Sequence, residues 1–250
     1  MALMIFYEKP IALNRERHRQ MKLRRMKPRE GRGEFAFARA TNSVLMAAVE
    51  VIDAVKDYPV VFVAGSSGQY VLAGLLGLQD QENLFVDTDG HWRRGAYVPA
   101  FVRRYPFVLA DDENGRLTVC VDESFSGLNE AEGEPLFDEA GQDTKLLQDA
   151  VDFLKRFHVE MQRTRAFTDR LAALGLLVPK IIRVNRNNRQ EILQGLHVVD
   201  EEKLRNLGDA EALELFRNGY LALIHAHLSS LGNVERLARM LPVGKASADA

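Results

Sequence analysis

Residues 68–107 read GQYVLAGLLGLQDQENLFVDTDGHWRRGAYVPAFVRRYPF and contain the strongest structural signals of the chain. Two apolar runs, 70–78 and 84–86, are separated by polar residues, and the turn formers Asp89-Gly90 follow the second run. Short apolar runs bounded by turn residues are typical of buried strands. The stretch therefore predicts strands joined by tight turns, and an antiparallel sheet is the simplest arrangement for them.

The residues before this stretch extend the predicted sheet. The run VVFVAG, 60–65, precedes Ser66-Ser67-Gly68 and predicts a strand that pairs with 70–78 as a hairpin. Gly74 and Gly77 inside the second strand indicate a bulge or the close approach of another backbone. Further upstream, FAFA at 35–38 predicts a short strand. Apolar spacing over 45–58 predicts a helix, which Pro59 ends.

The residues that follow continue the pattern. ENLFVD, 82–87, predicts another short strand, and 96–105 predicts a short helix that stops before Pro106. Strands at 107–111 and 117–122 are expected on either side of the turn formers Glu113-Asn114-Gly115.

The second half of the chain has a helical character. Apolar positions from Asp143 onward recur at helical spacing until Gly175 and predict one helix of about thirty residues. The runs 176–185 and 191–200 then predict a hairpin. Asp200 and Asp209 are candidate caps of two further helices, in the second of which the apolar positions from Phe216 to Leu231 share a face.

These patterns predict an α+β protein. We expect a β-rich lobe with a basic N-terminal arm at residues 1–135, packed against a helix-rich lobe with a hairpin at residues 136–250. The two lobes are expected to act as one functional unit.

Charge is unevenly distributed although the net charge is only −2. Nine Lys or Arg stand between Arg15 and Arg32 against two glutamates, and eleven Asp or Glu stand between Asp111 and Asp143 against Arg116. One interpretation is that the two stretches are solvated or neutralise each other across the fold. The other is that they bind a charged partner, although the overall balance gives no nucleic-acid signature.

Several classes of protein lack their usual signals here. The single cysteine, Cys120, excludes an internal disulfide and favours a reducing compartment, so we expect a cytoplasmic protein. The first residues lack the pattern of a signal peptide, and no apolar run is long enough for a membrane helix. The sequence leaves the oligomeric state open.

We expect neither a cofactor nor a metal. The chain lacks the glycine-rich signatures of nucleotide-binding loops. His225 and His227 would project about 200° apart on a helix, so they cannot hold one metal, and His227 is expected on the apolar face. Cys120 is expected to be buried. His18 is expected to be an exposed group of the basic arm. No catalytic residue can be assigned.

Arginines and aromatic residues alternate near the end of the opening stretch. The candidate ligand-binding residues are Trp92, Arg93, Tyr97, Arg103 and Arg104, together with Asp122 in the following strand. Guanidinium groups bind carboxylates or phosphates in a bidentate manner, and aromatic faces stack on rings. In the alternative interpretation, one arginine of each pair points inward to a carboxylate or a buried carbonyl while Trp92 fills the core.

Several segments resemble the SapC family, whose label comes from bacterial surface-layer proteins. They are ENLFVD (82–87), HWRRGAYVPAFVRRYPF (91–107), CVDES (120–124), LFDEAGQ (136–142), LQGLHVVDEEKL (193–204) and NGYLALIHAHLSSLGNVERL (218–237). The resemblance covers nearly the whole chain. It implies a surface-layer-associated or accessory protein and supplies no catalytic motif.

Three functions follow as hypotheses. The leading one is a non-catalytic accessory or binding protein that holds an acidic or aromatic ligand, with a protein or peptide segment as its partner. The first alternative is a structural component of the surface layer, which would require export without a leader. The second is an enzyme with carboxylates such as Asp122 or Glu123 in a cleft between the lobes.

Overall fold

The computed structural model describes residues 4–24, 33–65, 68–111, 117–186 and 189–241. The chain forms two compact units that interleave along the sequence. Unit 1 comprises Met1–Ala38, Val86–Trp92 and Ala100–Glu160, and unit 2 comprises Arg39–Phe85, Arg93–Pro99 and Met161–Ala250. The expected boundary at residue 135 therefore falls inside unit 1, because the chain passes between the units several times.

Unit 1 contains two small antiparallel sheets. The first has the order β1 (Pro10–Ala12), β7 (Leu117–Asp122), β6 (Phe107–Asp111), with Ile11 opposite Val121 and Val108 opposite Cys120. The second has the order β8 (Leu128–Asn129), β2 (Lys22–Leu23), β9 (Glu134–Pro135). The N-terminal segment thus supplies one strand to each sheet, which fixes it along the unit.

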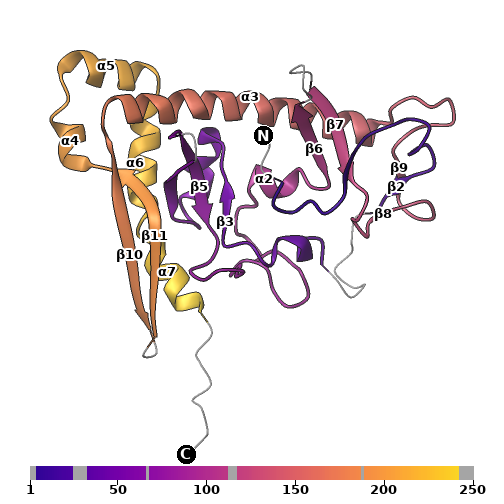
Figure 1. Ribbon diagram of the computed structural model, residues 1–250, viewed down its shortest axis with the longest axis horizontal. Helices are drawn as coiled ribbons and strands as arrows, with labels where there is room; N and C mark the ends of the chain where they lie inside the picture. Colours follow the sequence, from indigo (N-terminus) through magenta and orange to yellow (C-terminus); the bar gives the residue numbers. More distant parts are fainter. Residues whose placement is uncertain (1–3, 25–32, 66–67, 112–116, 187–188, 242–250) are drawn as a thin grey trace, which may run out of the picture. The chain divides into compact units, whose positions relative to one another are not determined.

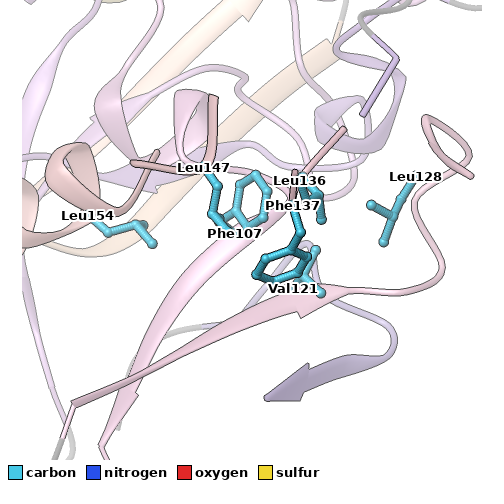
Figure 2. Close-up of a cluster of buried hydrophobic side chains, with 7 residues drawn as sticks. All are labelled: Phe107, Val121, Leu128, Leu136, Phe137, Leu147 and Leu154. Carbon is cyan, nitrogen blue, oxygen red and sulfur yellow. The ribbon is translucent and has the colours of Figure 1, made fainter. Parts of the chain in front are cut away.

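The core of unit 1 lies between the first sheet and the long helix α3 (Lys145–Ala173), whose residues up to Glu160 belong to this unit. Apolar side chains from β6, β7, β8, a loop and α3 converge there, as Figure 2 shows. They are Phe107, Val121, Leu128, Leu136, Phe137, Leu147 and Leu154. Leu154 is only 2% exposed, so the apolar stripe predicted for this helix does face a core.

Unit 2 is built on a five-stranded antiparallel sheet. Its order is β10 (Leu177–Arg186), β11 (Arg189–Val199), β4 (Val60–Ala64), β5 (Tyr70–Leu75), β3 (Ser43–Leu45). β11 pairs with β4 through Leu196 opposite Val63 and His197 opposite Phe62. This pairing joins segments from the two halves of the sequence in one sheet, and the long β10–β11 hairpin is conspicuous in Figure 1.

Helices complete both units. Unit 1 has the 3-10 helix η1 (Ala36–Ala38) and α2 (Ala100–Arg103). Unit 2 has η2 (Ala48–Glu50), α1 (Val51–Ala54), α4 (Glu201–Arg205), α5 (Asp209–Arg217), α6 (Tyr220–Ser230) and α7 (Asn233–Met240). The predicted Asp200 cap is confirmed, since its carboxylate accepts hydrogen bonds from the backbone N–H groups of Glu202 and Lys203.

The predicted α+β class is confirmed, as are most of the predicted elements. The hairpin of β4 and β5, the strands β6 and β7, the helix α3, and the hairpin of β10 and β11 all form where expected. The helix expected over 96–105 is limited to α2 (Ala100–Arg103). Both glycines of the hairpin region permit close approach: a Cβ at Gly74 would lie 2.6 Å from the sulfur of Met46, and one at Gly77 would lie 2.3 Å from the carbonyl oxygen of Glu82. The predicted turns at 66–67 and 113–115 lie outside the described residues.

Two predicted strands are wrong. Residues 36–38 form η1 instead, and Phe37 stacks on Tyr105 with 4.0 Å between ring centroids. Residues 82–87 form a turn at Leu84-Phe85 and an isolated bridge from Val86 to Trp92. The side-chain oxygen of Asn83 accepts the backbone N–H of Phe85 and bends the chain there.

Two helix predictions need correction. The helix expected over 45–58 begins only at Val51, because Leu45 is part of β3. The cap of α5 is Gly208 rather than Asp209. The stripe from Phe216 to Leu231 is interrupted by Gly219, which adopts a left-handed φ of +72° between α5 and α6, and this leaves Phe216 68% exposed. Within the described part of the chain, no helix is long and apolar enough to cross a membrane.

Candidate functional site

A tight turn at Arg93–Tyr97 in unit 2 contains two of the predicted binding residues. The backbone N–H of Arg93 donates to the carbonyl of Phe85 at 2.7 Å, and the N–H of Ala96 donates back to the carbonyl of Arg93 at 3.1 Å. Gly95 has a φ of +80°, a conformation that is unfavourable for residues with a Cβ. The sequence Arg-Arg-Gly therefore bends the chain directly after two adjacent arginines.

Tyr97 anchors this turn to unit 2 at three points. Its backbone N–H donates to Asp57 Oδ2 at 2.8 Å, and its hydroxyl donates to Glu50 Oε1 at 2.8 Å. Its carbonyl oxygen accepts the hydroxyl of Tyr58, which is fully buried. Glu50 and Asp57 are each 5% exposed, so the supporting carboxylates are shielded from competing water. These three hydrogen bonds hold the turn in place.

Arg93 and Arg94 project from this anchored turn into solvent. Both are exposed, and within the described ranges neither guanidinium group takes part in a hydrogen bond or an ion pair. A guanidinium group carries five N–H donors in a planar fork that matches a carboxylate or a phosphate. Two such groups on neighbouring residues of a fixed turn are available to a ligand without breaking an internal contact.

The second arginine pair, in unit 1, is divided between interior and surface. Arg104 is buried, with its guanidinium carbon 4.0 Å from the ring centroid of Phe101 and 5.4 Å from that of Phe157. Burial lowers the pKa of Arg104, while the neighbouring Tyr7 opposes this effect. Arg103 is exposed and lies over the ring of Phe153 at 5.2 Å. One arginine of this pair therefore points inward, into an aromatic cage.

Trp92 and Tyr97, the aromatic candidates, are half-buried and lie in different units. Trp92 packs edge-on against Phe35 with 5.5 Å between ring centroids. The predicted set is thus split: Trp92, Arg103, Arg104 and Asp122 are in unit 1, whereas Arg93 and Tyr97 are in unit 2.

Asp122, at the end of β7, is fully buried and holds the N-terminal segment. Its carboxylate accepts the backbone N–H groups of Glu8 and Lys9, each at 3.0 Å, and the hydroxyl of Tyr105 at 3.2 Å. Ser124 donates its N–H at 3.0 Å and its hydroxyl at 2.7 Å. Burial alone would raise the pKa of Asp122, but the hydrogen bonds from Ser124, Glu8 and Lys9 outweigh it and the pKa lies below its ordinary value.

The adjacent Glu123 collects three basic side chains. Arg17 donates to both carboxylate oxygens, with Nε at 2.6 Å and Nη2 at 2.9 Å, and Lys9 Nζ lies at 2.9 Å. His18 Nε2 lies 3.2 Å from Glu123 Oε1, while His18 Nδ1 lies 3.0 Å from the backbone of Asn14. Hydrogen bonds from Arg17 and then Lys9 lower the pKa of Glu123 to about 2.

The expectation that His18 is exposed is wrong, since its exposure is 0%. The cause is a partner that lies far along the chain. The acidic end of β7 is 105 residues downstream of His18, and the fold brings the two together.

A comparison with protein-family models matches the family described as SapC over residues 13–237. The chain belongs to the SapC family. Searches of curated proteins and of solved structures each found no match. The family assignment rests on nearly the full length of the chain and includes residues of both units.

The two carboxylates at the end of β7 are poorly suited to catalysis in this SapC protein. Asp122 accepts five hydrogen bonds and Glu123 is engaged by three side chains, so their oxygens are occupied by internal donors. A low pKa also makes each a weak general base. Their geometry supports the attachment of the N-terminal segment.

The remaining candidate groups of the SapC chain have structural contacts. His227 is 1% exposed, its Nδ1 lies 2.7 Å from the carbonyl oxygen of Val60, and its Nε2 accepts the N–H of Val199, so its predicted place on the apolar face is confirmed. Cys120 is buried as predicted, and burial raises its pKa. Among the described residues, no group of three or more His, Cys, Asp or Glu is placed to hold a metal ion.

Sequence reasoning missed the residues that support the Arg93–Tyr97 turn. Glu50 and Asp57 look like ordinary polar residues of an amphipathic helix in the sequence, and Arg236 is one of many charged residues near the C-terminus. In the fold, Asp57 is the common partner of Tyr97 and Arg236. The only local signal was an acidic side chain, Glu50, within an otherwise apolar run.

Proposed function

We propose that this SapC-family protein is a non-catalytic binding protein that holds an acidic polypeptide segment at the Arg93–Tyr97 turn. The observation that supports the proposal most is the pair of exposed arginines, Arg93 and Arg94, whose guanidinium groups make no hydrogen bond or ion pair within the described ranges. Their support by Tyr97 reduces the conformational freedom that would be lost on binding.

An acidic segment fits this site better than a purely aromatic ligand. Each guanidinium fork can take one carboxylate in a bidentate manner, and charge-assisted hydrogen bonds of this kind are among the strongest in proteins. The aromatic neighbour Tyr97 is half-buried, and its hydroxyl is already engaged by Glu50, so it offers little ring surface for stacking.

Binding of a labelled, glutamate-rich peptide, followed by fluorescence anisotropy, tests the proposal. Replacing both arginines, in Arg93→Gln/Arg94→Gln, should weaken binding by about tenfold or more, since two charge contacts are lost. Arg93→Lys/Arg94→Lys should lie between this variant and the wild type, because the charge remains and the planar fork is lost.

The matched control is Arg156→Gln/Arg217→Gln, which removes the same charge from exposed positions on α3 and α5. The control should bind like the wild type. Equal loss in the control would show that only net charge matters, and unchanged binding by Arg93→Gln/Arg94→Gln would remove the turn as the site.

A further inference from the structure

A hollow of about 360 Å³ lies in unit 2 between β10 and α7. Its apolar lining consists of Val184 from β10 and of Val234 and Ala238 from α7. Arg183 and Arg239 line it from the two opposing elements. Figure 1 shows α7 beside the β10–β11 hairpin. Asn185 and Glu235 complete the lining, so the hollow combines an apolar surface with two cationic groups and one carboxylate.

The charges at this hollow are available to a ligand. Arg183 is exposed and, within the described ranges, its side chain makes no hydrogen bond or ion pair. Arg239 pairs with Glu235 at 3.4 Å, but the two side chains are 80% and 82% exposed. Exposed pairs of this kind contribute little free energy, so a ligand carboxylate can replace Glu235 at low cost.

Helix α7 is attached to Asp57 and Tyr58, which also support the Arg93–Tyr97 turn. Arg236 Nη2 lies 3.2 Å from Asp57 Oδ1, and the other oxygen of Asp57 accepts the N–H of Tyr97. Asn233 Nδ2 donates to the carbonyl oxygen of Tyr58 at 3.2 Å, and the Tyr58 hydroxyl donates to Tyr97. One wall of the hollow and the arginine turn are thus fixed through Asp57 and Tyr58.

The connection limits the distance between the two sites. Two residues lie between Arg94 and Tyr97, a single carboxylate links Tyr97 to Arg236, and about one helical turn separates Arg236 from Arg239. These steps add up to at most about 30 Å, which an extended peptide of about ten residues can span.

The charge along this route is complementary to an acidic chain. Five guanidinium groups, those of Arg93, Arg94, Arg183, Arg236 and Arg239, occur there with the carboxylates of Glu50, Asp57 and Glu235. The side chain of Asp57 is 7% exposed, and its carboxylate oxygens are occupied by Tyr97 and Arg236. The surface between the turn and the hollow is consequently cationic at both ends.

We propose that the β10–α7 hollow is a second subsite for the same acidic polypeptide, so that one extended segment of about ten residues binds the Arg93–Arg94 turn and the hollow together. This inference rests on the proposed function and specifies its partner. The segment has acidic residues toward both ends, and an aliphatic side chain enters the hollow between Val184, Val234 and Ala238.

Peptide length separates the inference from the proposal on which it rests. A short acidic peptide of about four residues can occupy the turn alone, whereas one of about twelve residues can reach both subsites. The wild type should bind the long peptide about tenfold more tightly than the short one, because the second subsite adds contacts within one molecule. Arg183→Gln/Arg239→Gln should remove that advantage and leave binding of the short peptide unchanged.

The control variant Arg156→Gln/Arg217→Gln should still bind the long peptide more tightly than the short one. Equal affinity for the two peptides, or long-peptide binding unchanged by Arg183→Gln/Arg239→Gln, would overturn the second subsite while the turn remained the site. If Arg93→Gln/Arg94→Gln bound both peptides as tightly as the wild type does, the proposed function itself would be overturned. A single-stranded oligonucleotide of matched charge that bound more tightly through the same four arginines would overturn the choice of a polypeptide.

Discussion

The arginines of the N-terminal segment and those of the Arg93–Tyr97 turn form two clusters that look alike in the sequence and differ in the fold. Arg15 meets Asp143 at 3.1 Å, Arg17 meets Glu123, and Arg24 meets Glu132 at 3.0 Å. Each partner lies more than a hundred residues away. Arg93 and Arg94 meet no carboxylate among the described residues.

The difference shows that a basic cluster is a candidate for ligand binding only when the fold does not pair its side chains with acidic groups of the same chain. For the described residues of the N-terminal arm, the expectation that the basic and acidic stretches neutralise each other is confirmed. The arm is held to unit 1 by its ion pairs, whereas the turn presents its two arginines on the surface of unit 2. The two regions should therefore respond differently to mutation.

The largest effect should come from Asp122, which fixes the arm at the end of β7. In Asp122→Asn the amide nitrogen faces backbone donors that previously met a carboxylate, so buried N–H groups lose their partners. We expect the free energy of unfolding to fall by about 4 kcal/mol, as measured by denaturant titration. Asp152→Asn, at an exposed position of α3, should be nearly neutral. A similar stability for both variants would contradict the anchoring role.

The two units should also lose stability in different pH ranges. Burial lowers the pKa of His227 to about 4, so between its ordinary value near 6.5 and about 4 the folded protein binds fewer protons than the unfolded chain. Stability should therefore fall as pH falls through this range, by an amount on the order of 3 kcal/mol. The carboxylate of Glu123, with its pKa lowered to about 2, contributes stability that is lost only as pH falls from about 4.5 toward 2.

Nuclear magnetic resonance titration of the imidazole and unfolding curves at several pH values check this order. His227→Gln should reduce the pH dependence between about 6.5 and 4, and Glu123→Gln should reduce the dependence below about 4.5, to which the lowered pKa of Asp122 also contributes. An imidazole of His227 that titrates near its ordinary pKa would show that the side chain is not held neutral by burial.

A smaller effect is expected within the second arginine pair. Arg104→Lys loses the planar group that lies against Phe101 and Phe157 and should cost about 1.5 kcal/mol of unfolding free energy. Arg103→Lys, at an exposed position, should cost less than about 0.5 kcal/mol. Thermal unfolding of the two single variants provides the measurement, and equal shifts would contradict the division into an inward and an outward arginine.

The sequence predicted the elements well where the apolar period was regular. β4, β5, β10, β11 and α3 lie where their patterns indicated, and the cap at Asp200 follows from local chemistry. Predictions failed at 35–38 and 82–87, where aromatic stacking and the Asn83 side chain override the apparent strand pattern. Such effects depend on residues whose neighbours in space are not neighbours in sequence.

The candidate site was predicted only in part for the same reason. Residue types identified Arg93, Arg103 and Arg104 as candidates, but local sequence could not show that Arg104 lies among aromatic rings or that Asp122 binds the N-terminal segment. The burial of His18 depends on Glu123, and the support of Tyr97 depends on Glu50 and Asp57. These partners come from segments brought together by the interleaved course of the chain.

The smallest effect should come from the turn itself. Because neither guanidinium group makes a hydrogen bond or an ion pair with a described residue, Arg93→Gln/Arg94→Gln should change the free energy of unfolding by less than about 0.5 kcal/mol. Tyr97→Phe serves as the positive control for a destabilised turn. It removes the hydrogen bond to Glu50 and keeps the ring, and this should lower the free energy of unfolding by about 1 kcal/mol. Thermal and denaturant unfolding of the three proteins decide the matter. If the arginine variant were destabilised as much as Tyr97→Phe, its loss of peptide binding would be explained by loosening of the turn, and Arg93 and Arg94 would resemble the paired arginines of the N-terminal segment after all.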